Sequence, residues 1–283
     1  MSKVDIEKVL SKVNDVLPPQ PAIRLMVEKG KPGLFDSKLG GIPYYPKDME
    51  YPRGKNNVFA NEPMVLLAQL NFEKLPKLPD FPTKGILQFY IAPDDLYGMS
   101  TECYGKALTR QDNFRIIYHK DIITDETKLL SETEIPKYMG DEECYLPFEG
   151  EYLLSAVETE NMPATTNDFR FGDAFVKCYN EYTGENAEDI WELDEEITDY
   201  IFEKDNFPDA IVGGYPIFTQ DDPRYDDSIK DCDTLLFELD SVYDKEKGID
   251  ILWGDMGTGA FLIPRKNLKE LDFTKVVYNY DCS

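Results

Sequence analysis

The sequence predicts an α+β fold: two β-rich pseudo-repeats forming largely antiparallel sheets, an N-terminal helix and an acidic, helix-containing insert. Three observations support it: short motifs that recur in one order, many aromatic residues, and an amphipathic N-terminal segment. The 18 Tyr, 16 Phe and 2 Trp are typical of a dense β-rich interior. A chain of 283 residues with 42% hydrophobic content can bury its own core, so we expect a single domain over 1–283.

Internal repetition is the strongest of these signals. Five pairs of segments recur in the same order: 40–43 and 213–216, 66–71 and 235–240, 85–91 and 259–263, 95–96 and 267–268, and 114–118 and 273–278. The first pair is a Gly-Gly-x-Pro motif, which suits a tight turn because glycine adopts positive φ readily. An unduplicated β protein that reuses turns and strands is the alternative. The shared order favours a duplication, with pseudo-repeat one at 37–121 and pseudo-repeat two at 211–281.

The strand pattern is clearest at 86–91. Leu87, Phe89 and Ile91 alternate with Ile86, Gln88 and Tyr90, so the two sets point to opposite faces of a sheet. The runs at 65–70 and 235–239 are almost continuously apolar, which is typical of central strands.

The remaining segments predict helices and further strands. Residues 2–17 form an amphipathic pattern that includes Val16, with Ser2 to Asp5 resembling a capping box. We expect this helix to pack on the sheet. The acidic insert at 122–210 is expected to contain strands at 150–157 and 174–179 and a helix at 186–204.

Charge is concentrated in that insert. The chain carries a formal net charge of −25, and the segment from Asp121 to Ala210 holds 26 acidic and 5 basic side chains, a net of −21. Such a chain repels nucleic acid phosphates and anionic lipids, so we expect neither as a partner. The acidic face either is simply solvated or offers a docking surface for a basic protein.

Cysteine usage and hydropathy indicate a compartment. The five cysteines are far apart, without a Cys-x-x-Cys pair, and their odd number argues against a complete disulfide framework. No run approaches the roughly 20 apolar residues of a membrane-spanning helix, and the N-terminus lacks a secretion pattern. We therefore expect a cytoplasmic protein that contacts no membrane.

Few residues point to catalysis. His119 is the single histidine and follows a predicted strand, so we expect it to be structural rather than the base of a nucleophilic site. No glycine-rich phosphate motif occurs, and we expect no nucleotide cofactor. The sequence favours binding over catalysis.

Two groups of residues are candidates for a binding site. A cleft between the pseudo-repeats would be lined by Trp253, Asp255, Gln69 and Gln88, because glycines around Asp255 permit a sharp bend beside an indole. The alternative is that Asp255 caps a turn and Trp253 fills the core.

The second group is a run of aspartates that could hold calcium or magnesium: Asp221, Asp222, Asp226 and Asp227. It lacks the spacing of a dedicated calcium loop, and an ordinary acidic turn is the competing explanation. If the protein is instead a metal-dependent enzyme or small-ligand binder, Asp221, Asp222 and Asp255 are the residues we would expect to serve it.

Several motifs resemble one protein family. They lie at residues 37–46, 67–71, 85–89, 213–216 and 253–257. These residues are similar to the YwqG family, a bacterial family named after an uncharacterised Bacillus protein and classed as a domain of unknown function. The resemblance spans residues 20–282, although Tyr51-Pro52 stands where members often carry Trp-Pro.

The resemblance implies an α+β fold with a large antiparallel sheet system and supplies no activity or substrate. Some members lie near secreted-toxin genes, which implies an immunity or interaction role. Combined with the charge distribution, it leads us to expect that the acidic insert engages a basic protein, such as a nuclease-type toxin.

Overall fold

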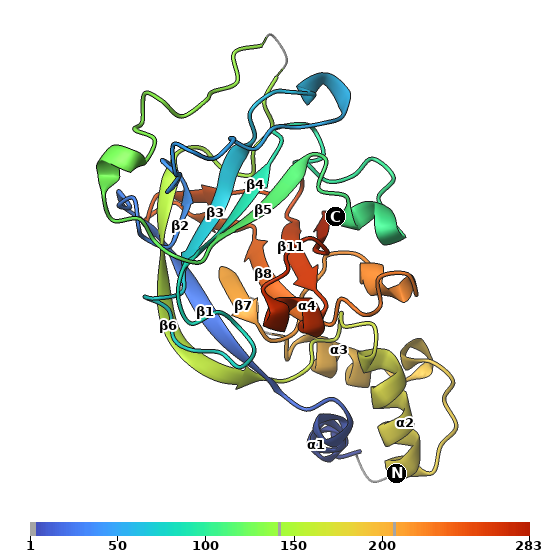
Figure 1. The fold of residues 1–283 in the computed structure, drawn as a ribbon. Helices are drawn as coiled ribbons and strands as arrows, with labels where there is room; N and C mark the ends of the chain where they lie inside the picture. The colour runs from blue at the N-terminus through green and yellow to red at the C-terminus, as the bar shows by residue number, and fades with distance from the viewer. Residues whose placement is uncertain (1–3, 141–142, 206–207) are drawn as a thin grey trace.

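The computed structural model describes residues 4–140, 143–205 and 208–283 and contains a ten-stranded antiparallel sheet (Figure 1). The strands, in sheet order, are β12 (Val277–Asp281), β11 (Thr258–Ile263), β8 (Thr234–Asp240), β7 (Ala210–Gly213), β1 (Gln20–Lys29), β6 (Glu151–Met162), β2 (Lys38–Gly40), β3 (Val65–Asn71), β4 (Ile86–Ile91) and β5 (Phe114–His119). A separate hairpin pairs β9 (Val242–Asp244) with β10 (Ile249–Ile251). The predicted antiparallel, strand-rich architecture is confirmed.

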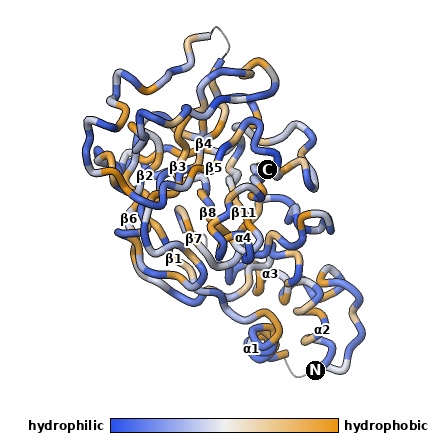
Figure 2. Tube along the Cα trace, viewed as in Figure 1, coloured by the Kyte–Doolittle hydropathy of each residue, from blue (hydrophilic) through white to orange (hydrophobic). Residues whose placement is uncertain are grey.

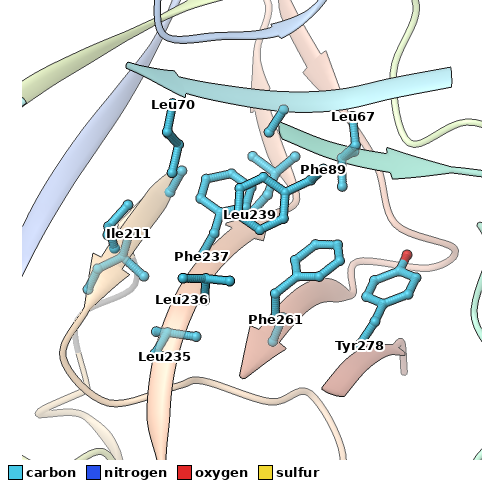
Figure 3. Packing of buried hydrophobic residues seen from close by; sticks show 14 of the residues in the cluster. Leu67, Leu70, Phe89, Ile211, Leu235, Leu236, Phe237, Leu239, Phe261 and Tyr278 are labelled. Atoms are coloured by element: carbon cyan, nitrogen blue, oxygen red, sulfur yellow. The ribbon is translucent and has the colours of Figure 1, made fainter. Parts of the chain in front are cut away.

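The sheet curls into a nearly closed barrel around its central pair, β1 and β6. The part from β2 to β5 therefore lies over the part from β7 to β12, and the side chains between them form the main core. Phe89 of β4 meets Phe237 of β8 and Phe261 of β11, with ring centroids 5.0 and 4.8 Å apart (Figure 3). These contacts join residues distant in sequence.

Alternation along the strands separates the core from the outer face. Leu87, Phe89 and Ile91 belong to the main core, as predicted, whereas Ile86 and Tyr90 lie in small clusters on the other face. Figure 2 shows hydrophobic residues concentrated on the strands and hydrophilic residues along many outer loops. Both faces of β4 are buried, because loops cover the outer one.

The two edge strands approach each other where the barrel nearly closes. The ring of Phe114 on β5 lies 5.3 Å from that of Tyr278 on β12, and the Gln111 amide donates to the carbonyl of Phe273. Side chains thus link the edges, while β5 and β12 remain the two edge strands of the sheet in the described part of the chain.

Three helices form a second, smaller core beside the sheet: α1 (Ile6–Val16), α2 (Phe171–Thr183) and α3 (Glu195–Phe202). Val9 and Val13 of α1 share this core with Phe175 of α2 and Tyr215 of the second Gly-Gly-x-Pro turn. A fourth helix, α4 (Arg265–Glu270), follows β11. The N-terminal helix therefore packs mainly on another helix, not on the sheet as predicted.

The prediction for the N-terminal helix and one strand prediction need correction. The first helix begins at Ile6, and Asp5 makes no side-chain capping hydrogen bond; Ser2 lies outside the described residues. Val16, predicted on the apolar stripe, is 51% exposed. The predicted strand at 174–179 is wrong, because these residues lie within α2.

The predicted helix at 186–204 divides into a 3-10 turn, η4 (Ile190–Glu192), and α3. The Asp189 carboxylate accepts a hydrogen bond from the Trp191 amide, and such local bonds compete with helix continuation. Of the residues whose helical spacing predicts an inward position, Ile190, Leu193, Ile197 and Ile201 are buried, whereas Tyr200 is only partly buried.

Replacing Phe261 with alanine should lower the free energy of unfolding by about 3–5 kcal/mol, because a fully buried ring is removed from between the two parts of the sheet. Chemical denaturation measures the change. Tyr243→Ala, at a ring that is 69% exposed, should cost less than about 1 kcal/mol. Equal losses in the two variants would contradict a core that joins the parts.

Candidate functional site

Gln69 and Gln88, two of the predicted cleft residues, lie together but are fully buried. The Gln69 Oε1 atom accepts from the backbone amide of Tyr44 and from Gln88 Nε2, at 2.9 and 2.8 Å. Its Nε2 atom donates to the carbonyls of Leu34 and Asp36. These bonds occupy the amide and tie the first Gly-Gly-x-Pro turn to the sheet.

His119 completes this network at the end of β5. Its Nε2 atom lies 2.9 Å from Gln88 Oε1, and the ring packs edge-on against Tyr44. Burial lowers the pKa of His119 to about 4, so the imidazole is neutral at physiological pH. The histidine is therefore a buried hydrogen-bonding group, in agreement with the structural role we expected.

Trp253 and Asp255 lie elsewhere, in the turn after β10. The indole is fully buried, 5.3 Å from the Tyr97 ring and 5.7 Å from that of Tyr280. Asp255 is exposed, and its backbone carbonyl accepts from the Ser283 hydroxyl. The turn uses a positive φ at Gly254. Trp253 thus fills the core, while the Asp255 carboxylate faces solvent.

The four candidate metal aspartates play different roles in one loop. Asp222 is buried and caps the short turn η5 (Pro223–Tyr225) by accepting from the Arg224 amide. Asp226 accepts from the Ser228 amide, Asp227 pairs with Lys230, and Asp221 is exposed. Within the described residues, no group of three or more His, Cys, Asp or Glu is arranged to hold a metal ion. This geometry adds no support to a calcium or magnesium site.

A buried ionic cluster holds this loop against the start of α2. The guanidinium of Arg224, fully buried, binds Asp222 at 2.6 Å and Asp168 at 2.9 Å. Asp168 also binds Arg170 at 2.7 Å. Burial by itself would raise the pKa of Asp168. The hydrogen bond from Arg170 and the charge of Arg224 outweigh burial, so the pKa of Asp168 is lowered. We call the part of the chain from α2 to the end of α3 (171–202) the helical segment. The cluster fixes the start of this segment to the loop that precedes β8.

A second set of buried carboxylates lies on β8 and β12. The Glu238 Oε2 atom accepts from the Ile217 amide and the Asp281 Oδ2 atom from the Gln220 amide. Asp281 Oδ1 is buried without a hydrogen-bond partner among the described residues. Burial raises the pKa of Glu238 well above its usual range, and burial raises that of Asp281 to about 6. These carboxyls anchor the second Gly-Gly-x-Pro turn.

The exposed face of the helical segment combines many carboxylates with one tryptophan. We define the acidic surface as the exposed carboxylates of Glu185, Glu188, Asp189, Glu192, Asp194, Glu195, Glu196, Asp199 and Glu203. Among the described residues, none of them forms an ion pair. Trp191 is 73% exposed and stacks on Phe202, with ring centroids 5.5 Å apart.

Local capping explains only part of this charge. Asp189 accepts from the Trp191 amide, and Glu195 and Glu196 occupy the first turn of α3, where the helix dipole favours negative charge. Glu192 accepts from the Glu188 amide, Glu185 accepts from the Tyr179 hydroxyl, and Asp194 precedes the first turn of α3. Within the described residues, the carboxylates of Glu188, Asp199 and Glu203 have no such bond or position, so the acidic surface is more negative than its own fold requires.

Sequence reasoning identified the acidity of this segment but not Trp191. The residue lies inside a pattern that predicted a helix, where an aromatic side chain is ordinarily assigned to the buried face. Its one available signal was the run of acidic residues on both sides, which is unusual around a core residue.

The fold and these sites define an antiparallel β protein with a helical elaboration. None of the helices within the described ranges is long and apolar enough to cross a bilayer. The family model described as Domain of unknown function (DUF1963) matches residues 37–282, and the chain belongs to this family. No curated protein matches the chain.

Asp281 should make stability depend on pH. Its pKa is raised from 3.8 to about 6, so its stabilising effect is complete below pH 3.8 and declines as pH rises through 6. Asp281→Asn keeps an acceptor for Gln220 but carries no charge. Between pH 4 and 8, its free energy of unfolding should gain about 2 kcal/mol relative to the unmodified protein.

Thermal or chemical denaturation at both pH values measures this gain. Asp227→Asn, whose carboxylate is 90% exposed, is the matched control and should show little relative change. A constant difference between Asp281→Asn and the unmodified protein would exclude Asp281 as the titrating group.

Proposed function

We propose that the protein binds a basic protein partner through the acidic surface, with Trp191 as the apolar centre of the contact. The observation that carries this proposal is the exposure of Trp191, at 73%, among carboxylates without ion-pair partners in the described chain. Tryptophan is enriched at the energetic centres of protein interfaces. Its stacking on Phe202 orients the indole and reduces the entropy that binding would cost.

Electrostatics supports the same partner. Neighbouring carboxylates repel one another, and a cationic surface relieves that repulsion on binding. The effect should also accelerate association at low ionic strength. Arginine side chains of the partner are suited both to carboxylates and to the face of the Trp191 ring.

We also infer that the sheet arose by duplication, which would make the helical segment an addition to the repeated unit. From the central pair outward, the strand order is β6, β2, β3, β4, β5 on one side and β1, β7, β8, β11, β12 on the other. Along the chain the succession occurs twice: a long strand (β1, then β6), a short strand before a Gly-Gly turn (β2, then β7), and three further strands of the sheet.

Matching hydrogen bonds support this inference. The amide of Tyr44, just after the first Gly-Gly-x-Pro turn, donates to Gln69 of β3 at 2.9 Å. The amide of Ile217, just after the second turn, donates to Glu238 of β8, also at 2.9 Å. Gln69 and Glu238 occupy the same position in the recurring segments of the sequence.

The bulges match as well. The pairing of β3 with β4 shifts between Leu66 and Ala68, and the pairing of β8 with β11 shifts between Phe261 and Leu262. Aligned on these bulges, Phe89 corresponds to Phe261. The sequence alignment of 85–91 with 259–263 is then displaced by two residues.

On this alignment, β6 belongs to the second repeat, and the added segment begins after it. The connection between β1 and β2 is a short loop, whereas the connection between β6 and β7 contains α2, η4 and α3. Function commonly resides in such elaborations of a scaffold. The acidic surface lies within this extra connection.

The test compares capture of partners by the tagged protein and by its Trp191→Ala variant from the native lysate, followed by affinity measurement with the purified partner. We expect a basic protein that elutes at moderate to high salt, because ionic contacts are screened. Trp191→Ala should weaken its affinity by about 10- to 100-fold, as expected for an interface centre.

A charge variant separates the two contributions. Glu188→Gln combined with Glu192→Gln and Glu196→Gln should slow association and reduce its dependence on salt. Tyr243→Ala, an exposed aromatic residue outside the helical segment, is the control and should bind normally. Unchanged affinity in both the Trp191 and the charge variants would refute this interface.

A further inference from the structure

A small cavity lies beside the second Gly-Gly-x-Pro turn. Its volume is about 70 Å³, and its lining comes from distant parts of the chain. Gly213 and Gly214 contribute to the lining, with Phe81 and Tyr215 as aromatic walls. The space exceeds what a single water molecule requires, so it can hold a group of several heavy atoms.

The turn that lines this cavity requires glycine. Gly213 and Gly214 have φ values of 75° and 73°, which side-chain-bearing residues rarely adopt. A Cβ atom on Gly213 would lie 2.6 Å from the carbonyl oxygen of Pro21. Any larger residue is therefore strained here.

Two arginines supply hydrogen-bond donors to the cavity. Arg265, the first residue of α4, donates from Nη1 to Asp80 and from Nη2 to Gln20, both at 3.3 Å. Arg170 uses Nε and Nη2 for Asp168. Within the described residues, Arg265 Nε and Arg170 Nη1 make no hydrogen bond, so each guanidinium retains a donor.

Three of the four carboxylate oxygens of the lining aspartates, Asp80 and Asp233, are engaged within the described residues. Asp80 pairs with Arg265 and, through its other oxygen, with Lys269 at 3.3 Å. Asp233 Oδ1 accepts from the Arg265 amide and from the Thr234 hydroxyl, at 3.0 and 3.2 Å. Beside one carboxylate oxygen left open in the described part of the chain, Asp233 Oδ2, the lining thus carries spare donors on two guanidinium groups, which favours a ligand that accepts hydrogen bonds.

We propose that this cavity binds the carboxylate of a small organic acid, held by Arg265 and Arg170. The planar guanidinium matches a carboxylate in shape and charge. A singly charged group also suits a chain of net charge −25 better than a doubly charged phosphate does. The aromatic walls contact the apolar part of the acid. This site is separate from the acidic surface and does not depend on the partner proposed there.

The experiment titrates the full chain with sodium acetate and follows the side-chain Nε–Hε NMR signals of its arginines. Sodium chloride at matched ionic strength is the reference. Acetate should shift the signals of Arg265 and Arg170 in a saturable way, and chloride should not. A linear response equal to that of chloride would overturn the proposal, as would saturable shifts confined to other arginines.

Variants test the role of the guanidinium. Arg265→Gln should weaken acetate binding at least tenfold, read from the Arg170 signal, and so should Arg265→Lys, which keeps the charge but loses the planar donor set. Arg110→Gln is the matched control. Arg110 is 47% exposed and pairs with Glu102, and Arg265 is similarly 45% exposed and pairs with Asp80. The acetate affinity of Arg110→Gln should not change.

Thermal melts establish that each variant is folded, and two Arg265 variants keep the test decisive if one fails to fold. Undiminished acetate binding in a folded Arg265 variant would overturn the proposal. Sodium phosphate forms the final arm. Tighter saturation of the same signals by phosphate would replace the carboxylate with a phosphate ligand and overturn the assignment.

Discussion

The pairing of β1 with β6 is the constraint on which the rest of the structure depends. These strands pair antiparallel from Gln20 opposite Met162 to Lys29 opposite Tyr152, with one irregularity between Ile23 and Leu25. Their outer edges carry β7 and β2, and every other strand of the main sheet attaches beyond those two. Because sheets twist, such a long central pair turns its two flanks toward each other. The aromatic core forms between the flanks.

Buried polar side chains then fix the turns to this frame. Gln69 and Glu238 each accept a hydrogen bond from a backbone amide just after a Gly-Gly-x-Pro turn. The side-chain amide of Gln69 accepts this bond without carrying a charge. The carboxyl of Glu238 is titratable, and burial raises its pKa well above the usual range. The backbone bond that holds each turn therefore has an uncharged acceptor at Gln69 and a titratable one at Glu238. The helical segment attaches through a different device, the Arg224 ionic cluster.

Strand alternation could be predicted because it is a local property of the sequence. Leu87, Phe89 and Ile91 of β4 all point into the main core, on the one face that their alternation indicates. The error at 174–179 came from too short a window: over the whole of α2 the buried residues Phe171, Ala174, Phe175, Cys178 and Tyr179 have helical spacing, which six residues do not reveal. Sequence spacing grouped Trp253 with Gln69, yet tertiary packing buries the indole among tyrosines. The cavity at Arg170 and Arg265 was inaccessible to sequence reasoning, because curling of the sheet brings distant residues together.

At the centre of the sheet, each long strand pairs with the short strand that follows the other long strand, and this limits how the chain can be cut into folding units. The short strand that follows β1 in the sequence, β2, pairs with β6, and the short strand that follows β6, β7, pairs with β1. A fragment ending after β5 would therefore expose both edges of β1 and would leave β2 without its long neighbour. Neither half of the chain is a self-contained folding unit. Cut between β5 and β6, the two fragments would have to fold by associating, as the subunits of an obligate dimer do.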